Sequence, residues 1–341
     1  MTNASVSLPP SATDEDVFTL YRELLGREPE SDDAVAGNRG QPLLDVALKF
    51  ARSDEYRARL HPQTPDGGAQ GTDPATQIQL MLTYRGLVAQ NHPLPRPGEV
   101  GFKCFSQTDE DGILLFLFSV IGITNKLCVE ICAGDGMECN TANLIINHGW
   151  HGLLVDGDEA NVERGTRFYA QSRHTYVHPP RFVHAWITRG SVNEILSNHG
   201  FSGEIDLLSL DLDGVDYWIW ESIACVSPRV VVVEYQDILG PKRSWTVPYS
   251  DDFSAWQHPV TGGSPNFAGA SLAAFVKLAR RKGYRLVAVN RLGYNAFFVR
   301  QGLREDLLPE IQVTECFSHP KVIEGMRGRF PTVEDFPWVE V

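Results

Sequence analysis

The chain has 341 residues, which is enough for one large α/β domain and one smaller domain. Its formal net charge of -13 repels nucleic-acid backbones and anionic lipid surfaces, so we expect no nucleic-acid partner. No apolar run approaches the roughly 20 residues that span a bilayer, so we expect no integral membrane segment. The polar N-terminus lacks the pattern of a secretory signal. The six cysteines form no Cys-x-x-Cys pair, which favours free thiols and a reducing, cytoplasmic location.

Helical apolar spacing near the N-terminus predicts a small all-α domain over residues 1–60. The predicted helices cover Asp14 to Leu25, with Asp14 as the N-cap, and Pro42 to Arg52. A segment rich in Pro, Gly, Thr and Asp follows and predicts a linker over residues 61–75. The remaining residues, 76–341, are predicted to form the second domain.

From Phe102 onward, strand and helix patterns alternate along the chain. Alternation of this kind predicts an α/β fold with a mostly parallel sheet and helices on both faces. The final hairpin adds an antiparallel strand. Strands are predicted at residues 127–131, 152–155, 182–187, 205–210, 229–233, 285–289 and 295–300. Helices are predicted within residues 76–100 and at residues 113–121, 141–148, 192–196, 217–223 and 271–282.

A turn of small residues follows the first predicted strand. Glu130 lies near the end of that strand, and Cys132, Gly134 and Gly136 follow at alternate positions. Small residues at such a turn let a ligand approach the backbone, and the next helix offers unpaired N–H groups. We expect a negative φ at Cys132, because cysteine is small but is not glycine. The alternative interpretation is a tight turn that binds no ligand.

The spacing Glu-x-Cys-x-Gly-x-Gly resembles the first motif of class I S-adenosylmethionine-dependent methyltransferases, with Cys132 in place of the first glycine. A nicotinamide oxidoreductase fits less well, because it needs glycine at Cys132 and another near Cys139. The resemblance implies a Rossmann-like sheet. Its cofactor half would cover about residues 102–200 and its acceptor or catalytic half about residues 201–300.

Asp156 ends the second predicted strand of the large domain. An acidic group at this place accepts hydrogen bonds from the ribose hydroxyls of a nucleoside cofactor. Asp158 is predicted instead to face solvent or to cap the next helix. In the family, residues just after the third strand flank the adenine, which implies this place for Ala185 and Trp186. A position in the core is the alternative for Trp186.

The segment from Ser106 to Gly112 also resembles a family stretch ahead of the cofactor turn. This resemblance implies that Gln107 and Asp111 reach the methionine end of the cofactor, S-adenosylmethionine. The full set of predicted cofactor-binding residues is Gln107, Glu130, Cys132, Ala133, Gly134, Asp135, Gly136, Asp156, Gly157, Ala185, Trp186 and Asp211.

The fourth strand and the residues after it are close to the Ile-Asp-Val-Glu-Gly-x-Glu signature of FkbM-type methyltransferases. The resemblance matches Asp211, Asp213 and Asp216 to the three acids of that family, with aspartate replacing glutamate at the last two. It extends to Glu234 at the end of the fifth strand. The family match thus adds a group of acids to the same edge of the sheet as the cofactor turn.

Asp211 and Glu234 end adjacent parallel strands, whose backbones lie roughly 5 Å apart. Carboxylates this close repel one another, so one takes up a proton or a cation binds. We predict catalytic roles for Asp211, Asp213 and Glu234, and the same three are the predicted ligands of Mg²⁺, whose presence the sequence leaves open. Capping of the following helix by Asp213 and Asp216 is the alternative.

The long segment after the fifth strand has little periodicity and is predicted to be a loop at the active edge of the sheet. Its His258 is a candidate catalytic base. Tyr249 and Trp256 are candidates for stacking on a sugar ring. Lys242 and Arg243 are candidates for holding a phosphate or carboxylate. An ordinary structural or surface role is the alternative for each of these side chains.

The sequence Leu-Tyr-Arg-Glu-Leu-Leu-Gly-Arg-Glu-Pro, with Phe-Ala-Arg-Ser-Asp-Glu-Tyr farther on, resembles a small helical module found beside bacterial surface-polysaccharide glycosyltransferases and methyltransferases. A generic helical hairpin is the alternative. Together the resemblances imply an S-adenosylmethionine-dependent O-methyltransferase that acts on a hydroxyl of a sugar or glycan intermediate. The alternatives are a natural-product methyltransferase with a non-sugar acceptor and a non-catalytic scaffold on the same fold. A homo-oligomer stays open.

Overall fold

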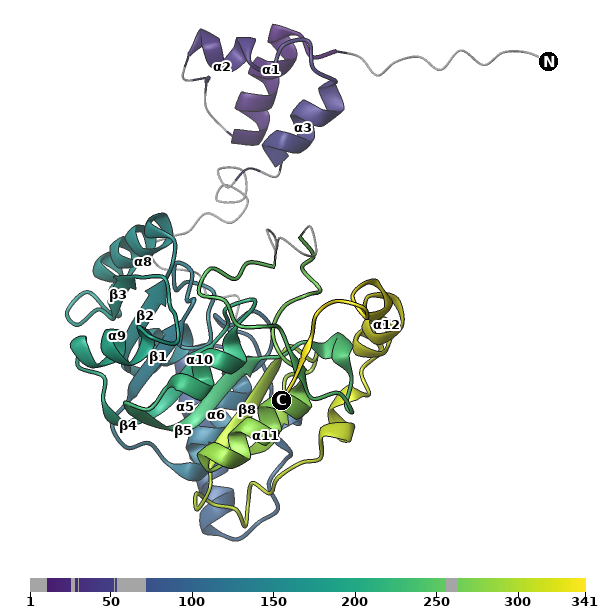
Figure 1. Ribbon diagram of the computed structural model, residues 1–341. Coiled ribbons are helices and arrows are strands. Elements are labelled where there is room, and N and C mark those ends of the chain that lie inside the picture. Colours follow the sequence, from purple (N-terminus) through teal and green to yellow (C-terminus); the bar gives the residue numbers. More distant parts are fainter. Residues whose placement is uncertain (1–10, 26–27, 30, 52, 54–71, 256–262) are drawn as a thin grey trace. The chain divides into compact units, whose positions relative to one another are not determined.

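A computed structural model describes residues 11–25, 28–29, 31–51, 53, 72–255 and 263–341 (Figure 1). The chain divides into two compact units, Met1–Gly68 and Ala69–Val341. Most of the predicted linker lies outside the described residues. Its last two residues, Pro74 and Ala75, already belong to a helix. Among the described residues, every helix is too short or too polar to cross a bilayer.

The N-terminal unit is helical, as the apolar spacing predicts. It contains α1 (Asp14–Leu20), the π-helical turn η1 (Tyr21–Leu25), α2 (Asp32–Ala36) and α3 (Leu43–Ala51). The N-cap of α1 is Thr13 rather than the predicted Asp14, because the Thr13 hydroxyl accepts a hydrogen bond from the Asp16 N–H. The short helix α2 was not predicted. The apolar core of this unit contains Val17, Val35, Val46 and Phe50.

The large unit is built on a seven-stranded sheet with the order β3-β2-β1-β4-β5-β8-β7. Neighbouring strands are parallel, except that β8 runs antiparallel to both β5 and β7. This arrangement confirms the predicted α/β fold with a mostly parallel, Rossmann-like sheet and an antiparallel strand from the final hairpin. The strands are β1 (Leu127–Ile131), β2 (His151–Asp156), β3 (Arg181–His184), β4 (Gly203–Leu210), β5 (Val226–Glu234), β7 (Tyr284–Val289) and β8 (Asn295–Arg300).

Helices cover both faces of this sheet (Figure 1). The predicted helices are present, and the structure adds α8 and α12. The helices are α5 (Pro74–Ala89), α6 (Glu110–Ile121), α7 (Ala142–His148), α8 (Glu159–Gln171), α9 (Val192–Asn198), α10 (Asp216–Ser222), α11 (Leu272–Lys282) and α12 (Pro320–Gly328). Short 3₁₀ turns are η2 (Pro97–Glu99), η3 (Asp237–Leu239), η4 (Val313–Phe317) and η5 (Phe330–Thr332).

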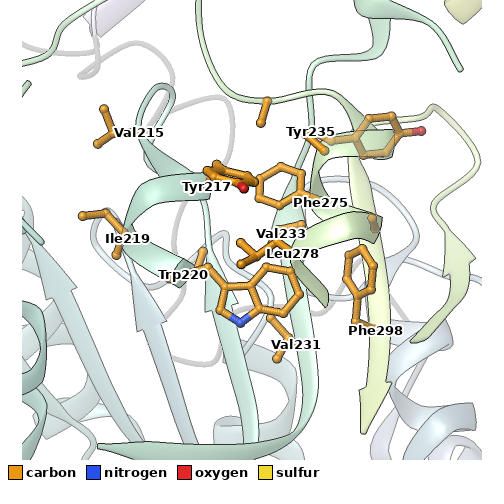
Figure 2. Close-up of a cluster of buried hydrophobic side chains, with 14 of the residues drawn as sticks. Val215, Tyr217, Ile219, Trp220, Val231, Val233, Tyr235, Phe275, Leu278 and Phe298 are labelled. Atoms are coloured by element: carbon orange, nitrogen blue, oxygen red, sulfur yellow. The ribbon is translucent and has the colours of Figure 1, made fainter. Parts of the chain in front are cut away.

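The valines of β5 show how one strand serves two cores. Val231 and Val233 pack in one apolar cluster, while Val230 and Val232 pack in a second cluster. This alternation follows from the two-residue period of a strand, because successive side chains point to opposite faces. Figure 2 shows the first cluster, in which Trp220 of α10 lies among side chains from β5, α11 and β8.

Two features depend on contacts that are remote in sequence. The two-residue strand β6 (Trp245–Thr246) pairs antiparallel with β9 (Val339–Glu340) at the end of the chain. Neither strand was predicted, because two residues are too few to show a periodic pattern. Strand β3 ends at His184, three residues before the predicted end, so Ala185 and Trp186 belong to the connection that follows.

A buried ion pair ties the start of β1 to β4 and β5. The Asp206 carboxylate accepts hydrogen bonds from the N–H groups of Thr124, Asn125 and Lys126 at 2.7–3.1 Å. The Arg229 guanidinium donates to the same carboxylate at 3.0 Å, and both side chains are buried. Burial alone would raise the pKa of Asp206, but the backbone and Arg229 hydrogen bonds lower it.

We expect Asp206→Ala to lower the free energy of unfolding by about 3–5 kcal/mol, because it leaves the buried Arg229 charge without a carboxylate partner and three N–H groups unpaired. Chemical denaturation measures this change. The control is Glu204→Ala on the same strand, which removes the exposed ion pair with Arg300 and should cost less than about 1 kcal/mol. Equal losses in the two variants would contradict the role given to Asp206.

Candidate functional site

The pairing of the four parallel strands β2, β1, β4 and β5 aligns the residues that follow the last pairs between them in one row. Ile131 pairs with Val155 of β2 and with Leu210 of β4, and Leu210 pairs with Val233 of β5. The next residue along each strand is therefore in register with its neighbours. The row contains Asp156, Cys132, Asp211 and Glu234. Three acids and a cysteine thus meet at the carboxyl edge of the sheet, where open α/β sheets bind ligands.

The turn after β1 has a left-handed backbone at alternate residues. The φ angles are 61° at Cys132, 58° at Gly134 and 70° at Gly136. The expectation of a negative φ at Cys132 is therefore wrong. A side chain in this region costs roughly 1–2 kcal/mol relative to glycine, so the turn holds Cys132 in a strained conformation. The thiol is exposed.

Gly134 and Gly136 serve the turn differently. A methyl group built at Gly134 would meet no atom within 4 Å, so space lies open beside this backbone. At Gly136 the same methyl group would lie 2.8 Å from the Phe182 ring. The Gly136 carbonyl also accepts a hydrogen bond from the Tyr169 hydroxyl at 2.6 Å. Phe182 and Tyr169 thus pack against the turn at Gly136, whereas the space beside Gly134 is open. A turn that binds a ligand requires such an open backbone.

Glu130 holds the other end of this turn. Its buried carboxylate accepts hydrogen bonds from the N–H groups of Asn140 and Thr141 at 2.9 and 2.8 Å, and from the Thr141 hydroxyl at 2.6 Å. These contacts occupy both oxygens and satisfy N–H groups ahead of α7. Direct contact between Glu130 and a cofactor stays a prediction.

Asp156 lies against the open side of the turn. One carboxylate oxygen accepts a hydrogen bond from the Gly134 N–H at 2.8 Å. The other accepts from the Asp158 N–H at 2.9 Å and from the Asn161 amide at 3.0 Å. These contacts fix the carboxylate at the end of β2. Asp158 caps α8 through the Ala160 N–H, which confirms one of its two predicted roles.

Trp186 is not a core residue, so the alternative role for this side chain is wrong. The residue is 60% exposed, and its indole N–H donates to the Asp251 carbonyl at 2.6 Å. A methyl group built at Gly157 would lie 3.0 Å from the ring, so the indole covers the residue after Asp156. An exposed indole at this place offers a flat apolar surface on which a base can stack.

Asp211, Asp213 and Glu234 form an acid cluster, with one carboxylate oxygen from each lying within 4.8 Å of the others. Burial, followed by the charge of Asp216, raises the pKa of Asp211. Burial, followed by the charge of Asp211, raises the pKa of Glu234 well above its usual value. The interaction between the two carboxyl groups favours the proton on Glu234. The cluster therefore holds a proton or calls for a cation.

Asp216 has a different task from the acid cluster. Its carboxylate accepts hydrogen bonds from the N–H groups of Leu212 and Gly214 at 2.6 and 3.1 Å, so it shapes the loop that presents Asp213. Asp213 itself has a φ of 51° and does not cap α10. The helix-capping alternative is therefore wrong for Asp213, and Asp216 holds the preceding loop instead. Burial raises the pKa of Asp216 to about 6.

The segment after β5 folds over this loop. Phe253 lies so close that a methyl group at Gly214 would come within 2.6 Å of its ring, and the Gly269 N–H donates to the Gly214 carbonyl at 2.9 Å. Tyr249 lies beside Arg189 rather than facing open space, since its hydroxyl accepts from the Arg189 N–H at 2.8 Å.

The remaining predicted acceptor residues are dispersed. The Arg243 guanidinium lies 4.0 Å from the centre of the Phe330 ring and 3.7 Å from the Glu334 carboxylate. Lys242 is exposed. Trp256 and the candidate base His258 lie outside the described residues, so their roles stay predictions.

Gln107 and Asp111, the residues predicted to contact the methionine end of the cofactor, differ in their surroundings. Asp111 is fully buried, and one of its oxygens accepts hydrogen bonds from the N–H groups of Cys104, Phe105 and Ser106. This carboxylate therefore shapes its own loop, which explains its place in the motif. Gln107 is exposed beside it.

A cavity of about 120 Å³ adjoins the acid cluster. Asp213 and Glu234 form part of its wall, together with Asp237 and Tyr294, and Arg329 completes it from beyond α12. Arg329 was not predicted as a site residue from the sequence. No local motif marks this arginine, and only the return of the C-terminal segment brings it to the sheet edge.

No protein-family model and no curated protein sequence matches the chain. Among similar solved structures, magnesium protoporphyrin IX methyltransferase from Synechocystis is 14% identical over 75% of this chain and 96% of that chain, with a TM-score of 0.34. An O-methyltransferase from Bacillus cereus is 12% identical over 65% and 89%, with a TM-score of 0.36. A TehB-like methyltransferase from Corynebacterium glutamicum is 13% identical over 67% and 100%, with a TM-score of 0.33.

The raised pKa of Glu234 predicts a pH-dependent stability. The folded protein holds this proton more tightly than the unfolded chain does, so its stabilising effect is complete below the ordinary pKa of about 4 and declines as pH rises toward the folded pKa. In the presence of a chelator, we expect Glu234→Gln to lose less stability than the wild type between about pH 5 and pH 8, by about 1 kcal/mol or more.

Thermal or chemical unfolding at several pH values measures this difference. Glu163→Gln, at an exposed position of α8, is the control and should follow the wild type. If Glu234→Gln also follows the wild type, the raised pKa is wrong.

Proposed function

We propose that the protein is an S-adenosylmethionine-dependent O-methyltransferase whose acceptor is a hydroxyl of a sugar or glycan intermediate. The observation that carries this proposal is the row of Asp156, Cys132, Asp211 and Glu234 at one edge of the sheet. The first half of the row, Asp156 and Cys132, suits a nucleoside. The second half, Asp211 and Glu234, offers carboxylates where an acceptor hydroxyl would react. A scaffold protein has no need for coupled, partly buried carboxyl groups beside an open turn.

The first half of the row fits the adenosine part of the cofactor. The Asp156 carboxylate lies at the strand end from which ribose hydroxyls are bound. Its present partners include the Gly134 N–H, which connects the ribose position to the open turn. The exposed ring of Trp186 lies over Gly157 and would flank the adenine. Together these groups match the ribose and the adenine of one nucleoside.

The second half of the row fits proton removal from a hydroxyl. The bound cofactor supplies the methyl group and the sulfur leaving group. Asp211 would accept the hydroxyl proton, and Glu234, which carries the proton of the pair, would help to hold the oxygen in line for attack. Asp211, Asp213 and Glu234 would be the ligands if Mg²⁺ binds, since the ion prefers oxygen ligands and their spacing suits a single ion. The ion would lower the pKa of the hydroxyl.

The acceptor class rests on two resemblances in the sequence. The acids from Asp211 to Asp216 follow the FkbM-type signature, and the N-terminal unit resembles a module associated with polysaccharide enzymes. A compact three-helix arrangement in that unit is consistent with such a module. A sugar hydroxyl is therefore the acceptor we favour over other natural products.

We expect Asp156→Ala to weaken binding of S-adenosylhomocysteine at least tenfold, because the ribose loses its charged hydrogen-bond acceptor. Calorimetric titration measures the affinity. The matched control is Asp158→Ala, which removes the cap of α8 two residues away and should leave the affinity within about threefold of the wild type. Unchanged binding by Asp156→Ala would reject the ribose role, and no binding by the wild type would favour the scaffold alternative.

We expect Mn²⁺, used as a paramagnetic probe for Mg²⁺, to bind the wild type and to be displaced by Mg²⁺. Asp213→Asn removes an exposed carboxylate ligand, so it should weaken the ion at least tenfold without affecting the core. Electron paramagnetic resonance titration measures free Mn²⁺. Asp335→Asn, at an exposed position outside the cluster, should bind like the wild type. Binding that is equal in both variants would remove the metal from the acid cluster.

A further inference from the structure

The cavity beside the acid cluster has a wall of opposite charge. Asp213 and Glu234 line one part of the cavity, and Arg329 lines another. Lys321 does not line the cavity itself, but its ammonium lies 3.5 Å from the carboxylate of Asp237, which does line it. We call Lys321, Arg329 and Asp237 the cationic wall.

Asp237 holds the two cations in place from beneath. Its side chain is buried, and both of its oxygens accept hydrogen bonds from Nη2 of Arg329 at 2.8 Å. Lys321 is fixed further by the Tyr294 ring, whose centre lies 3.2 Å from the ammonium. Gly325 leaves room for the guanidinium, since a methyl group there would lie 2.6 Å from Nη2. The wall is therefore ordered before any ligand binds.

The cationic wall has hydrogen-bond donors that the described part of the chain does not use. Among the described residues, the hydrogen bonds of the Arg329 guanidinium all come from Nη2, which leaves Nε and Nη1 without a protein acceptor. The side chain is 39% exposed, so a ligand can reach it. Two cations face one carboxylate, so Lys321, Arg329 and Asp237 together carry one net positive charge beside the acids of the cluster. A planar guanidinium with free donors is suited to a carboxylate or phosphate.

We propose that the cationic wall binds an oxyanion carried by the acceptor, while the acid cluster takes the acceptor hydroxyl. This inference rests on the proposed methyltransferase function and narrows its substrate to hydroxyl compounds bearing a phosphate or carboxylate, such as sugar phosphates and sugar acids. The cationic wall and the acid cluster would bind opposite ends of one acceptor molecule and so select acceptors by their charge. A neutral sugar leaves the Arg329 donors unpaired and binds more weakly.

The experiment follows the arginine Nε–H resonances of the intact protein saturated with S-adenosylhomocysteine. The Arg329 signal is assigned by its loss in Arg329→Lys. The probes are inorganic phosphate, D-glucuronate and D-glucose. We expect phosphate or glucuronate to shift the Arg329 signal in a saturable manner, and we expect glucose to leave it unchanged. The anion with the larger effect distinguishes a phosphate-bearing from a carboxylate-bearing acceptor.

Two variants test the contact by calorimetry. Arg329→Met should weaken the binding of the preferred anion at least tenfold, and Arg327→Met, at an exposed neighbouring position, should leave it unchanged. The wild-type resonance shift keeps the test decisive if Arg329→Met folds poorly. An unshifted Arg329 signal with both anions, or an equal response to glucose, overturns the proposal. Failure of S-adenosylhomocysteine to bind the same sample counts against the methyltransferase function instead, so the two failures are separate.

Discussion

The in-register pairing of β2, β1, β4 and β5 is the constraint on which the site depends. Parallel strands end at the same edge, and here the residues that follow the last pairs between these four strands are Asp156, Cys132, Asp211 and Glu234. A shift of one residue in the pairing register of any of these strands would turn its residue of the row toward the opposite face of the sheet, because side chains alternate with a period of two. The buried pair of Asp206 and Arg229 helps to fix this register from the other end of the sheet.

The site places carboxyl groups close together, and the rest of the fold must compensate for the unfavourable free energy of this arrangement. Asp211 and Glu234 have raised pKa values because they are partly buried and lie close together, which is unfavourable for a folded protein without a proton or cation at the cluster. The apolar clusters on both faces of the sheet supply the stability that permits this arrangement. Strain at Cys132 and Asp213, both with positive φ, lies at the same edge. Strain and buried charge are thus confined to the place where the proposed chemistry occurs.

The C-terminal segment brings positive charge to the acidic edge of the sheet. β9 pairs with β6, and α12 packs beside η3, so residues after 312 return to the segment that follows β5. This return brings Arg329 and Lys321 to Asp237, next to the acids of the cluster. Opposite charges on two walls of one cavity discriminate among ligands more sharply than either wall would alone, since a mismatched group is left unpaired.

The sequence by itself determined the sheet and its acidic strand ends. Apolar runs such as Val230 to Val233 read as a strand because their pattern is local, and the acids that end β2, β4 and β5 follow directly from the strand boundaries. Only the tertiary structure decided the φ of Cys132, the exposure of Trp186 and the separate tasks of Asp213 and Asp216, because each depends on backbone geometry or on packing by distant residues. It also decided the cationic wall, because Asp237 and Arg329 meet through a chain return that no local pattern encodes.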